Sequence, residues 1–493
     1  MTTPSHHHRG AWTALAAAFL SLAVPAAVAT QDWPLWGGSP GRNMAASVSP
    51  LPATWDVKAG TNIKWKAELG STSYGNPVVA DGRIFVGTNN TSPRDAAVTG
   101  DKGILMCFRE SDGAFLWQAV SDKLAAGKEL DWPEQGICSS PAVVGKRLYY
   151  VTNRGELVCL DTDGFADGKN DGSVQDEARH GPHDADVIWR LDMVKDLGVV
   201  PRNMSNSSPV VWEDLVFLET SNGRDDEQGK VLAPAAPSFL AVNRETGKVV
   251  WQDASPGDRI LHGQWSSPAL GEVNGVMQAV FPGGDGWLYG FNARTGERLW
   301  KFDLNPKDSV WPKTRNDGIA TPVFVAGRVY MAVGQDPESG EGVGHLYAID
   351  PARGMQGREG AKPVDITESG RVWQYDKIRR SISTAAVANG LLFISDFSGF
   401  LHCVDAGTGV PRWTFDMLAA VWGSPLVADG KVYLGDEDGD VVVLDAGATM
   451  KKIAEPGMGG AVYSTPVAAN GVLYIMSRSQ LVAIAAPRAA ERQ

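Results

Sequence analysis

Short apolar runs separated by turn residues recur along the whole chain. Residues 431–435 (KVYLG) and 441–444 (VVVL) flank the acidic stretch 436–440. Runs rich in β-branched residues predict strands, and the Asp-Gly pair between them favours a hairpin because glycine accepts the positive φ of a tight turn. A helix-loop-helix calcium loop would need Gly at its sixth position and Glu at its twelfth, where this chain has Val441 and Gly447. The pattern therefore predicts a hairpin with its acids on an exposed turn.

The same frame recurs elsewhere. Most copies open with Ser or Thr followed by Pro, and continue through two apolar strands, an "L-x-small-x-Asp" stretch and a Trp. Eight copies are anchored at Pro77, Pro141, Pro209, Pro268, Pro322, Ala385, Pro425 and Pro466. The last two spacings, 40 and 41 residues, match the length of a four-stranded propeller blade. The longer copies carry insertions, which should cover one face of the ring and contribute to recognition.

The two ends of the chain complete each other. The eighth copy stops before a Trp, whereas Trp65 lies in an unassigned strand near the start of the chain. A ring that finishes its last blade with the N-terminal strand has no exposed sheet edge. We therefore predict an all-β, eight-bladed β-propeller over residues 65–487, closed by the N-terminal strand, with a lead-in segment at 30–64 and a tail at 488–493.

Three stretches identify a family resemblance. Residues 241–251 (AVNRETGKVVW), 290–300 (GFNARTGERLW) and 403–413 (CVDAGTGVPRW) resemble the tryptophan-docking motif of the eight-bladed pyrroloquinoline-quinone (PQQ) propeller superfamily. The resemblance covers about residues 32–487. It implies that each Thr-Gly makes a turn and that the following Trp docks between neighbouring blades. The superfamily includes quinoprotein alcohol dehydrogenases and the non-enzymatic propeller of the outer-membrane barrel-assembly machinery.

The dehydrogenases of this superfamily typically use an adjacent Cys-Cys disulfide, a Glu/Asn/Asp calcium set, a catalytic Asp and a Trp floor. This chain has no adjacent Cys pair and no haem CxxCH motif. Because fold alone does not transfer function, the sequence favours a binding or scaffold module. The alternative is a PQQ- and calcium-dependent periplasmic dehydrogenase of alcohols or sugars. The sequence leaves open whether the protein is an enzyme and whether it takes either cofactor.

The N-terminus has the pattern of an export signal. Arg9 precedes an apolar stretch at 11–24, and residues 27–29 (AVA) fit a small-x-small cleavage site, which predicts a signal peptide at 1–29. No later stretch is long and apolar enough to span a membrane. The formal charge of −12, without a basic run outside this leader, argues against a nucleic-acid partner. We expect a periplasmic or extracellular protein.

The cysteines and histidines give no metal or disulfide framework. Cys107, Cys159 and Cys403 share one repeat position where other copies have Gly, Ala or Val, so they are interpreted as buried structural thiols. The disulfide status of Cys138 stays open. His180 and His183 lack a placed third ligand, so no metal site is predicted.

The candidate site follows from the repeat register, since the first strand of each blade lines the central channel. Residues three or six positions before the anchors should ring the channel mouth, and together they suit a small molecule, glycan or protein. The candidate ligand-binding residues are Tyr74, Gln135, Asn203, His262, Trp265, Asn316, Arg379, Arg380, Trp422 and Tyr463, with Asp317 as a candidate catalytic base. We expect Trp265, Trp422, His262 and Arg379 to converge on one opening, the two Trp facing each other across it. Alternatively, these groups satisfy one another around a wet channel.

Overall fold

The computed structural model describes residues 1–2, 31–125, 130–334, 344–356 and 362–486, and divides into two units, Met1–Thr30 and Gln31–Gln493. The predicted signal peptide beyond its first two residues, and the predicted tail, lie outside the described residues. Within the described part of the chain no helix is long and apolar enough to cross a membrane.

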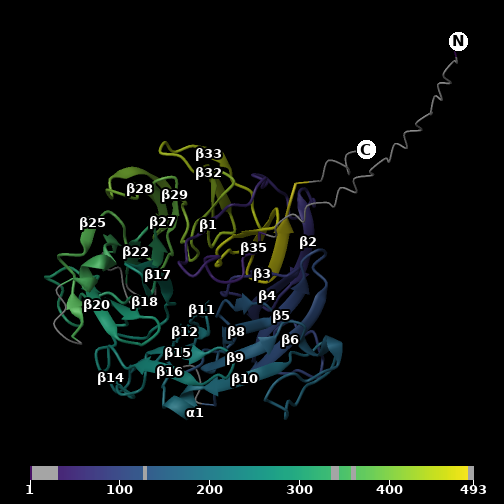
Figure 1. Ribbon diagram of the computed structural model, residues 1–493, viewed down its shortest axis with the longest axis horizontal. Coiled ribbons are helices and arrows are strands. Elements are labelled where there is room, and N and C mark those ends of the chain that lie inside the picture. The colour runs from purple at the N-terminus through teal and green to yellow at the C-terminus, as the bar shows by residue number, and fades with distance from the viewer. Residues whose placement is uncertain (3–30, 126–129, 335–343, 357–361, 487–493) are drawn as a thin grey trace. The chain divides into compact units, whose positions relative to one another are not determined.

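The unit Gln31–Gln493 consists of eight sheets that follow one another around a ring (Figure 1). Blade 1 contains β3 (Val78–Ala80), β4 (Arg83–Asn89), β5 (Lys102–Arg109) and β6 (Phe115–Asp122). Blade 2 contains β7 (Ala142–Val144), β8 (Arg147–Val151), β9 (Glu156–Asp161) and β10 (Val187–Asp192). Blade 3 contains β11 (Val210–Trp212), β12 (Leu215–Glu219), β15 (Phe239–Asn243) and β16 (Val249–Asp253). Blade 4 contains β17 (Ala269–Val273), β18 (Val276–Pro282), β19 (Trp287–Asn292) and β20 (Arg298–Asp303).

The second half of the ring repeats this arrangement. Blade 5 contains β21 (Val323–Val325), β22 (Arg328–Val333), β23 (His345–Ile349) and β25 (Arg371–Tyr375). Blade 6 contains β26 (Ala386–Ala388), β27 (Leu391–Ser395), β28 (Phe400–Asp405) and β29 (Pro411–Asp416). Blade 7 contains β30 (Leu426–Ala428), β31 (Lys431–Gly435), β32 (Val441–Asp445) and β33 (Lys452–Ala454). Blade 8 contains β34 (Val467–Ala469), β35 (Val472–Met476), β36 (Gln480–Ile484) and the N-terminal strand β2 (Ile63–Glu68).

The remaining elements belong to insertions and to the lead-in segment. The insertions hold η1 (Gly164–Asp167), α1 (Met193–Leu197), η2 (Pro351–Met355) and the hairpin of β13 (Arg224–Asp225) with β14 (Lys230–Val231). Strand β24 (Val364–Asp365) pairs in parallel with β20, and β1 (Ala45–Ala46) pairs in parallel with β30.

The predicted closure is confirmed. Strand β2 pairs antiparallel with β36 and places Trp65 opposite Ala483, in the sheet that also holds β34 and β35. Trp65 donates its indole N–H to Glu110 O of blade 1 at 3.0 Å. The first and last blades are therefore joined through the strand that the sequence assigned to this role.

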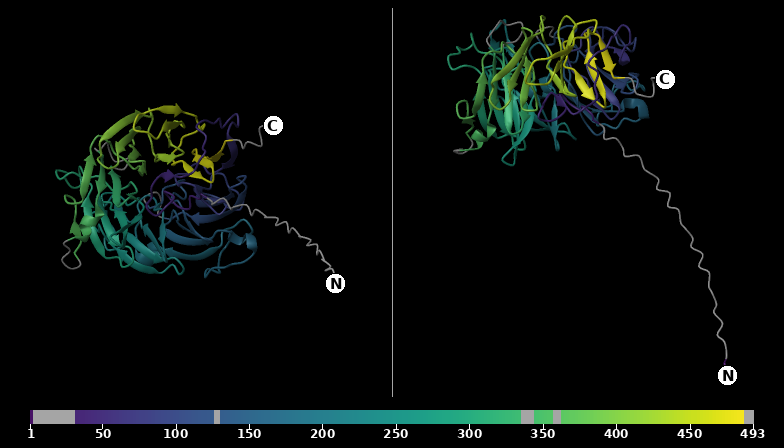
Figure 2. Two further views of the ribbon diagram at one scale, coloured as in Figure 1. Left: turned by 45° about the horizontal axis from the view of Figure 1, so that its top comes forward. Right: turned by 90° about the horizontal axis from the view of Figure 1, so that it is seen from above.

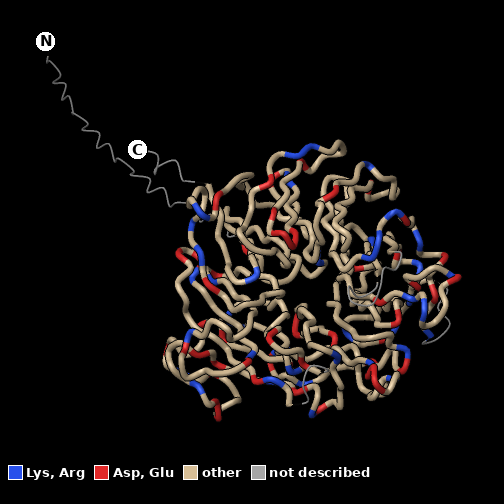
Figure 3. The backbone as a smooth tube through the Cα atoms, turned by 180° about the vertical axis from the view of Figure 1, so that it is seen from behind, with Lys and Arg blue, Asp and Glu red and all other residues tan. Residues whose placement is uncertain are grey.

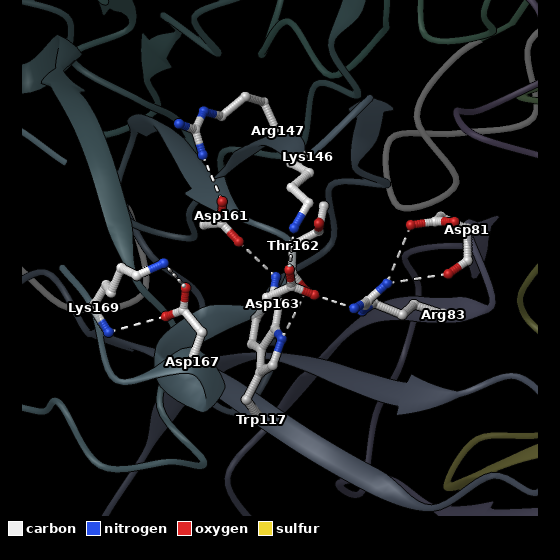
Figure 4. A network of polar contacts seen from close by, with 10 residues as sticks. All are labelled: Asp81, Arg83, Trp117, Lys146, Arg147, Asp161, Thr162, Asp163, Asp167 and Lys169. Carbon is white, nitrogen blue, oxygen red and sulfur yellow. Dashed lines mark hydrogen bonds and ion pairs between the residues drawn. The ribbon is translucent and has the colours of Figure 1, made fainter. Parts of the chain in front are cut away.

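The tryptophans dock between blades as the resemblance implied. Trp251 of blade 3, for example, donates to Ala293 O of blade 4 at 2.9 Å, and a Cβ on Gly296 would lie 2.6 Å from its ring. Position 296 therefore requires glycine for two reasons. A side chain there would clash with the Trp251 ring, and the φ of 72° lies in the left-handed region that favours glycine. Figure 4 shows the same contact at Trp117, which donates to Thr162 O beside the ion pair of Arg83 with Asp163.

A second set of contacts joins the blades near the axis. At most of the blades, the residue before the anchor accepts a hydrogen bond from the backbone N–H of its counterpart one blade earlier. Within the described residues, six such bonds are present, at 2.6–3.0 Å, with Asn76, Ser140, Ser208, Ser267, Ser424 and Thr465 as acceptors. The Ser or Thr of the repeat therefore links successive first strands into a ring.

Residues 31–47 form an N-terminal belt along the inner edges of the blades, where Figure 2 shows the purple part of the chain. The belt bonds to a residue in or within two residues of the first strand of every blade, with Val79, Val143, Ser208, Leu270, Phe324, Val387, Val427 and Asn470 as partners. Arg42 at its centre is completely buried and donates to Trp36 O, Ser208 O and Pro268 O. Burial lowers the pKa of Arg42 to about 9.

The acidic hairpin in blade 7 is confirmed, but one of its acids is placed differently from the prediction. Asp436 is buried, because its Oδ1 accepts the backbone N–H groups of Asp438, Gly439 and Asp440 and so closes the turn. Glu437, Asp438 and Asp440 are exposed as expected. The four cysteines are all buried and free, so Cys138 forms no disulfide, and burial raises its pKa to about 12.

Candidate functional site

The ring of residues three positions before the anchors lies at the end of the first strands opposite the belt. Seven of its eight members are half-buried while the residues that follow them are mostly buried. The exception is Cys138, which is 9% exposed. Partial exposure at equivalent positions of successive blades is the property expected of residues that line an opening.

Four aromatic rings from four successive blades pack together at this opening. Tyr74 lies 5.5 Å from Tyr463 between ring centroids, Tyr463 lies 5.7 Å from Trp422, and Trp422 lies 4.8 Å from Phe397. We call these residues the aromatic quartet. Edge and tilted contacts at such distances are favourable for aromatic pairs. Three of the four were sequence candidates, and Phe397 was missed because it lies in the turn between β27 and β28.

Charged side chains border the aromatic quartet. The guanidinium of Arg380 lies 4.6 Å from the Phe397 ring centroid, and that of Arg379 lies 5.4 Å from the ring of Phe400. Trp422 donates its indole N–H to Glu437 at 3.2 Å. These contacts fix the edge of the quartet and place both candidate arginines on one side of it.

Leu418 lies four residues before Trp422 in the chain. It is 88% exposed and has a left-handed backbone (φ 64°), which is unusual for leucine. Its neighbour Met417 donates its backbone N–H to Gly399 O in the turn that carries Phe397. The chain therefore presents an apolar side chain to solvent next to an aromatic surface.

His262 and Trp265 belong to a second cluster, at blades 3 and 4. Their rings lie 4.8 Å apart at 86°, and Trp265 donates its indole N–H to Arg202 O at 2.9 Å. Arg202 donates to His262 Nε2 at 3.3 Å and pairs with Asp226. Arg202 was not a sequence candidate. Trp422 and Arg379 make their ring contacts near Phe397 and Phe400, whereas His262 and Trp265 contact each other. Because the two Trp were expected to face each other across the opening without touching, the convergence of all four residues on one opening stays a prediction.

The other candidates are less accessible. Asn316 and Asp317 are 3% and 4% exposed, and the backbone of Asn316 exchanges hydrogen bonds with the side chain of Asn305. Asn203 adopts a φ of 60° and its carbonyl accepts the backbone N–H of Trp132. Gln135 is half-buried. Asp317 is therefore buried rather than presented at the mouth.

Buried acids lie behind the second cluster. Burial raises the pKa of Asp285 to about 6, although the Tyr289 hydroxyl donates to it at 2.8 Å. Glu219 at the end of β12 is fully buried, and this burial raises its pKa well above the ordinary value. Both carboxyls are consequently more readily protonated than exposed acids.

The described residues give no ligand set that can be assigned to a calcium-bound quinone. Within the described residues no three His, Cys, Asp or Glu side chains are grouped so that they could hold a metal ion. The four cysteines are unpaired, so the disulfide expected from the dehydrogenases has no counterpart. We therefore derive no catalytic step through PQQ.

The surface around the ring carries both signs of charge. Figure 3 shows Lys and Arg interspersed with Asp and Glu over the blades. A mixed surface of this kind provides no continuous basic stripe for a phosphate backbone.

Comparisons with known proteins agree with this architecture. The family described as "Outer membrane protein assembly factor BamB" matches residues 96–279 and 358–485. The BamB protein of Yersinia pestis is 25% identical over 246 residues, which are 46% of this chain. The matched region spans 56% of that relative, so the chain covers just over half of its length.

Solved structures share the fold. BamB from Moraxella catarrhalis superposes with a TM-score of 0.52 at 15% identity, covering 85% of this chain and 96% of that chain. A europium-containing methanol dehydrogenase gives 0.57 at 13% identity, covering 92% and 89%. The quinohemoprotein alcohol dehydrogenase from Comamonas testosteroni gives 0.58 at 13% identity, covering 93% and 81%. At these identities the likeness shows the fold alone.

Proposed function

Because this chain belongs to the family described as outer membrane protein assembly factor BamB, we propose that it is an exported scaffold propeller that binds another protein at its channel mouth. Export rests on the predicted signal peptide at 1–29. The class of partner rests on the family description, which names an assembly factor for outer membrane proteins. The place of binding rests on the contacts of the mouth itself.

The observation that carries the proposal is the aromatic quartet with Leu418 beside it. Trp, Tyr and Arg dominate the binding energy of protein interfaces, and the mouth offers Trp422, Tyr74, Tyr463 and Arg380 together. An exposed leucine next to aromatic rings is the kind of apolar patch that marks an interaction site. A partner that covered Leu418 would remove this apolar side chain from water.

A polypeptide fits this surface better than a small molecule. Small ligands bind in concave pockets that bury most of their surface. Neither of two well-formed pockets in the described residues includes a member of the quartet. Leu418 is 88% exposed and lines neither of these pockets.

The test is calorimetric titration of the protein with synthetic peptides that alternate aromatic and polar residues, as transmembrane β-strands do. Trp422→Ala should weaken binding by at least about tenfold. The matched control is Trp212→Ala, because Trp212 is also half-buried but follows the anchor of blade 3, away from the mouth.

Two results would count against the proposal. Equal binding by both variants, or no binding by the wild type, would exclude the quartet as the recognition surface for such strands. Stoichiometric binding of PQQ with calcium, together with alcohol-dependent dye reduction, would instead favour the dehydrogenase alternative.

A further inference from the structure

A pocket of about 570 Å³ lies between blades 1 and 2, away from the mouth. Its walls come from β6 of blade 1, from β8, β9 and β10 of blade 2, and from the insertions around residues 97–102 and 177–185. Ala119, Val120 and Val158 supply apolar surface. The volume lies within the range of pockets that bind small molecules.

Several polar groups of the wall are buried without a protein partner. Tyr150 lines the pocket and is 3% exposed as a whole residue. Ser121 is 7% exposed, and its Oγ has no partner in the described part of the chain. Nε of Arg154 also makes no hydrogen bond there, although it lies 3.8 Å from Glu156 Oε2. Buried polar groups are normally satisfied, so these atoms mark the pocket wall as locally incomplete in its hydrogen bonds.

The charged groups of the wall balance. Lys102, Arg154, Arg179 and Arg190 face Asp122, Glu156, Glu177 and Asp184. Lys102 pairs with Asp122 at 2.6 Å and Arg179 with Asp184 at 3.0 Å. Equal numbers of cations and anions favour a ligand without net charge, because an ion would leave one wall charge uncompensated inside a partly buried space.

Glu156 and the two nearest arginines remain loosely engaged. The Thr152 hydroxyl donates to Glu156 Oε2 at 3.4 Å, Arg154 Nε approaches the same oxygen only to 3.8 Å, and no ion pair of Arg190 with a described residue is present. Burial raises the pKa of Glu156. The positive charges of Arg154 and Arg190 lower this pKa, but by less than burial raises it. Hydroxyl donors would satisfy this carboxyl, while hydroxyl oxygens would accept from the arginines and from Tyr150.

We propose that this pocket binds a neutral, polyhydroxylated ligand of the saccharide class. A saccharide hydroxyl both donates and accepts, which matches a wall that offers donors at Tyr150, Ser121 and Arg154 and an acceptor at Glu156. The carbon face of a sugar ring can lie on Ala119 and Val158. The site is independent of the mouth, since the quartet and the pocket share no residue.

The experiment titrates the full chain calorimetrically with maltose, cellobiose and N,N′-diacetylchitobiose. At least one disaccharide should bind, and Tyr150→Phe, which removes only the hydroxyl, should weaken it about fivefold. Tyr149→Phe is the matched control, because Tyr149 is the next residue of β8 and packs on Trp189 at the other face of the blade. Ser121→Ala provides a second variant if Tyr150→Phe lowers the melting temperature.

Binding should persist in Trp422→Ala, which separates this site from the mouth and leaves the proposed function to its own test. The inference is overturned if none of the three disaccharides binds, or if Tyr149→Phe weakens binding as much as Tyr150→Phe. Preferential binding of citrate would overturn the assignment to a neutral ligand.

Discussion

The backbone N–H of Thr465 in blade 8 donates to Oδ1 of Asn76 in blade 1 at 2.6 Å, across 389 residues of sequence. Of the six bonds that link successive first strands near the axis, this is the one that joins the last blade to the first. The pairing of β2 with β36 completes the same blade at its outer edge. The ring is therefore closed by two contacts, one near the axis through Asn76 and one at the outer edge through β2.

Loss of the hydrogen bond between Thr465 and Asn76 should lower the free energy of unfolding. Asn76→Ala removes the acceptor and leaves the buried N–H of Thr465 unsatisfied, which should lower the free energy of unfolding by about 1–3 kcal/mol. Urea denaturation followed by tryptophan fluorescence measures this change. Asn206→Ala, at a half-buried mouth position, should stay within about 0.5 kcal/mol of wild type. Equal effects in the two variants would contradict the role of Asn76.

Replacing the docking tryptophan Trp300 should lower the free energy of unfolding. Its side chain is fully buried, donates to Gln278 Oε1 at 2.7 Å and lies against Gly354 of blade 5. Trp300→Ala should cost about 3–5 kcal/mol of unfolding free energy, through the cavity and the lost packing. The measurement is again equilibrium denaturation. A loss below about 1 kcal/mol would show that the site collapses without penalty.

Asp285 predicts a pH dependence. Its pKa rises from an ordinary 3.8 to about 6 in the folded protein. Below pH 3.8 the carboxyl is neutral in both states. As the pH rises towards 6, the unfolded chain ionises first, so stability relative to Asp285→Asn should fall by about 3 kcal/mol.

The measurement is unfolding free energy of wild type and Asp285→Asn from pH 3.5 to 7. Tyr289→Phe removes a hydrogen bond that holds this pKa down, so it should extend the loss to higher pH. Parallel curves for wild type and Asp285→Asn would show that the carboxyl titrates at its ordinary pKa.

The architecture could be predicted because it repeats. The Pro anchors and the docking Trp residues recur at one register, and an orphan strand with Trp65 matched an incomplete eighth copy. The mouth positions followed from the same register, which explains why Tyr74, Trp422 and Tyr463 were found together. A repeat converts positions far apart in sequence into neighbours in space.

Features outside the register could not be predicted. Phe397 lies in a turn of variable sequence, and Arg202 reaches Trp265 through its carbonyl and His262 through its side chain. The belt at 31–47 has no repeat pattern, because its backbone pairs with different blades in turn. Asp436 was predicted to be exposed because it lies among other acids. In the structure its carboxylate accepts hydrogen bonds from the backbone N–H groups of its own turn.

The central claim is that the mouth beside the aromatic quartet is a protein-binding surface. The most direct measurement places a photo-crosslinking amino acid at position 418 in the producing cell and compares it with position 250, an exposed valine on the outer strand of blade 3. We expect one discrete protein adduct at position 418, lost when Trp422→Ala is added, and none at position 250. Adducts of equal yield at both positions, or an adduct at 418 that survives Trp422→Ala, would contradict it.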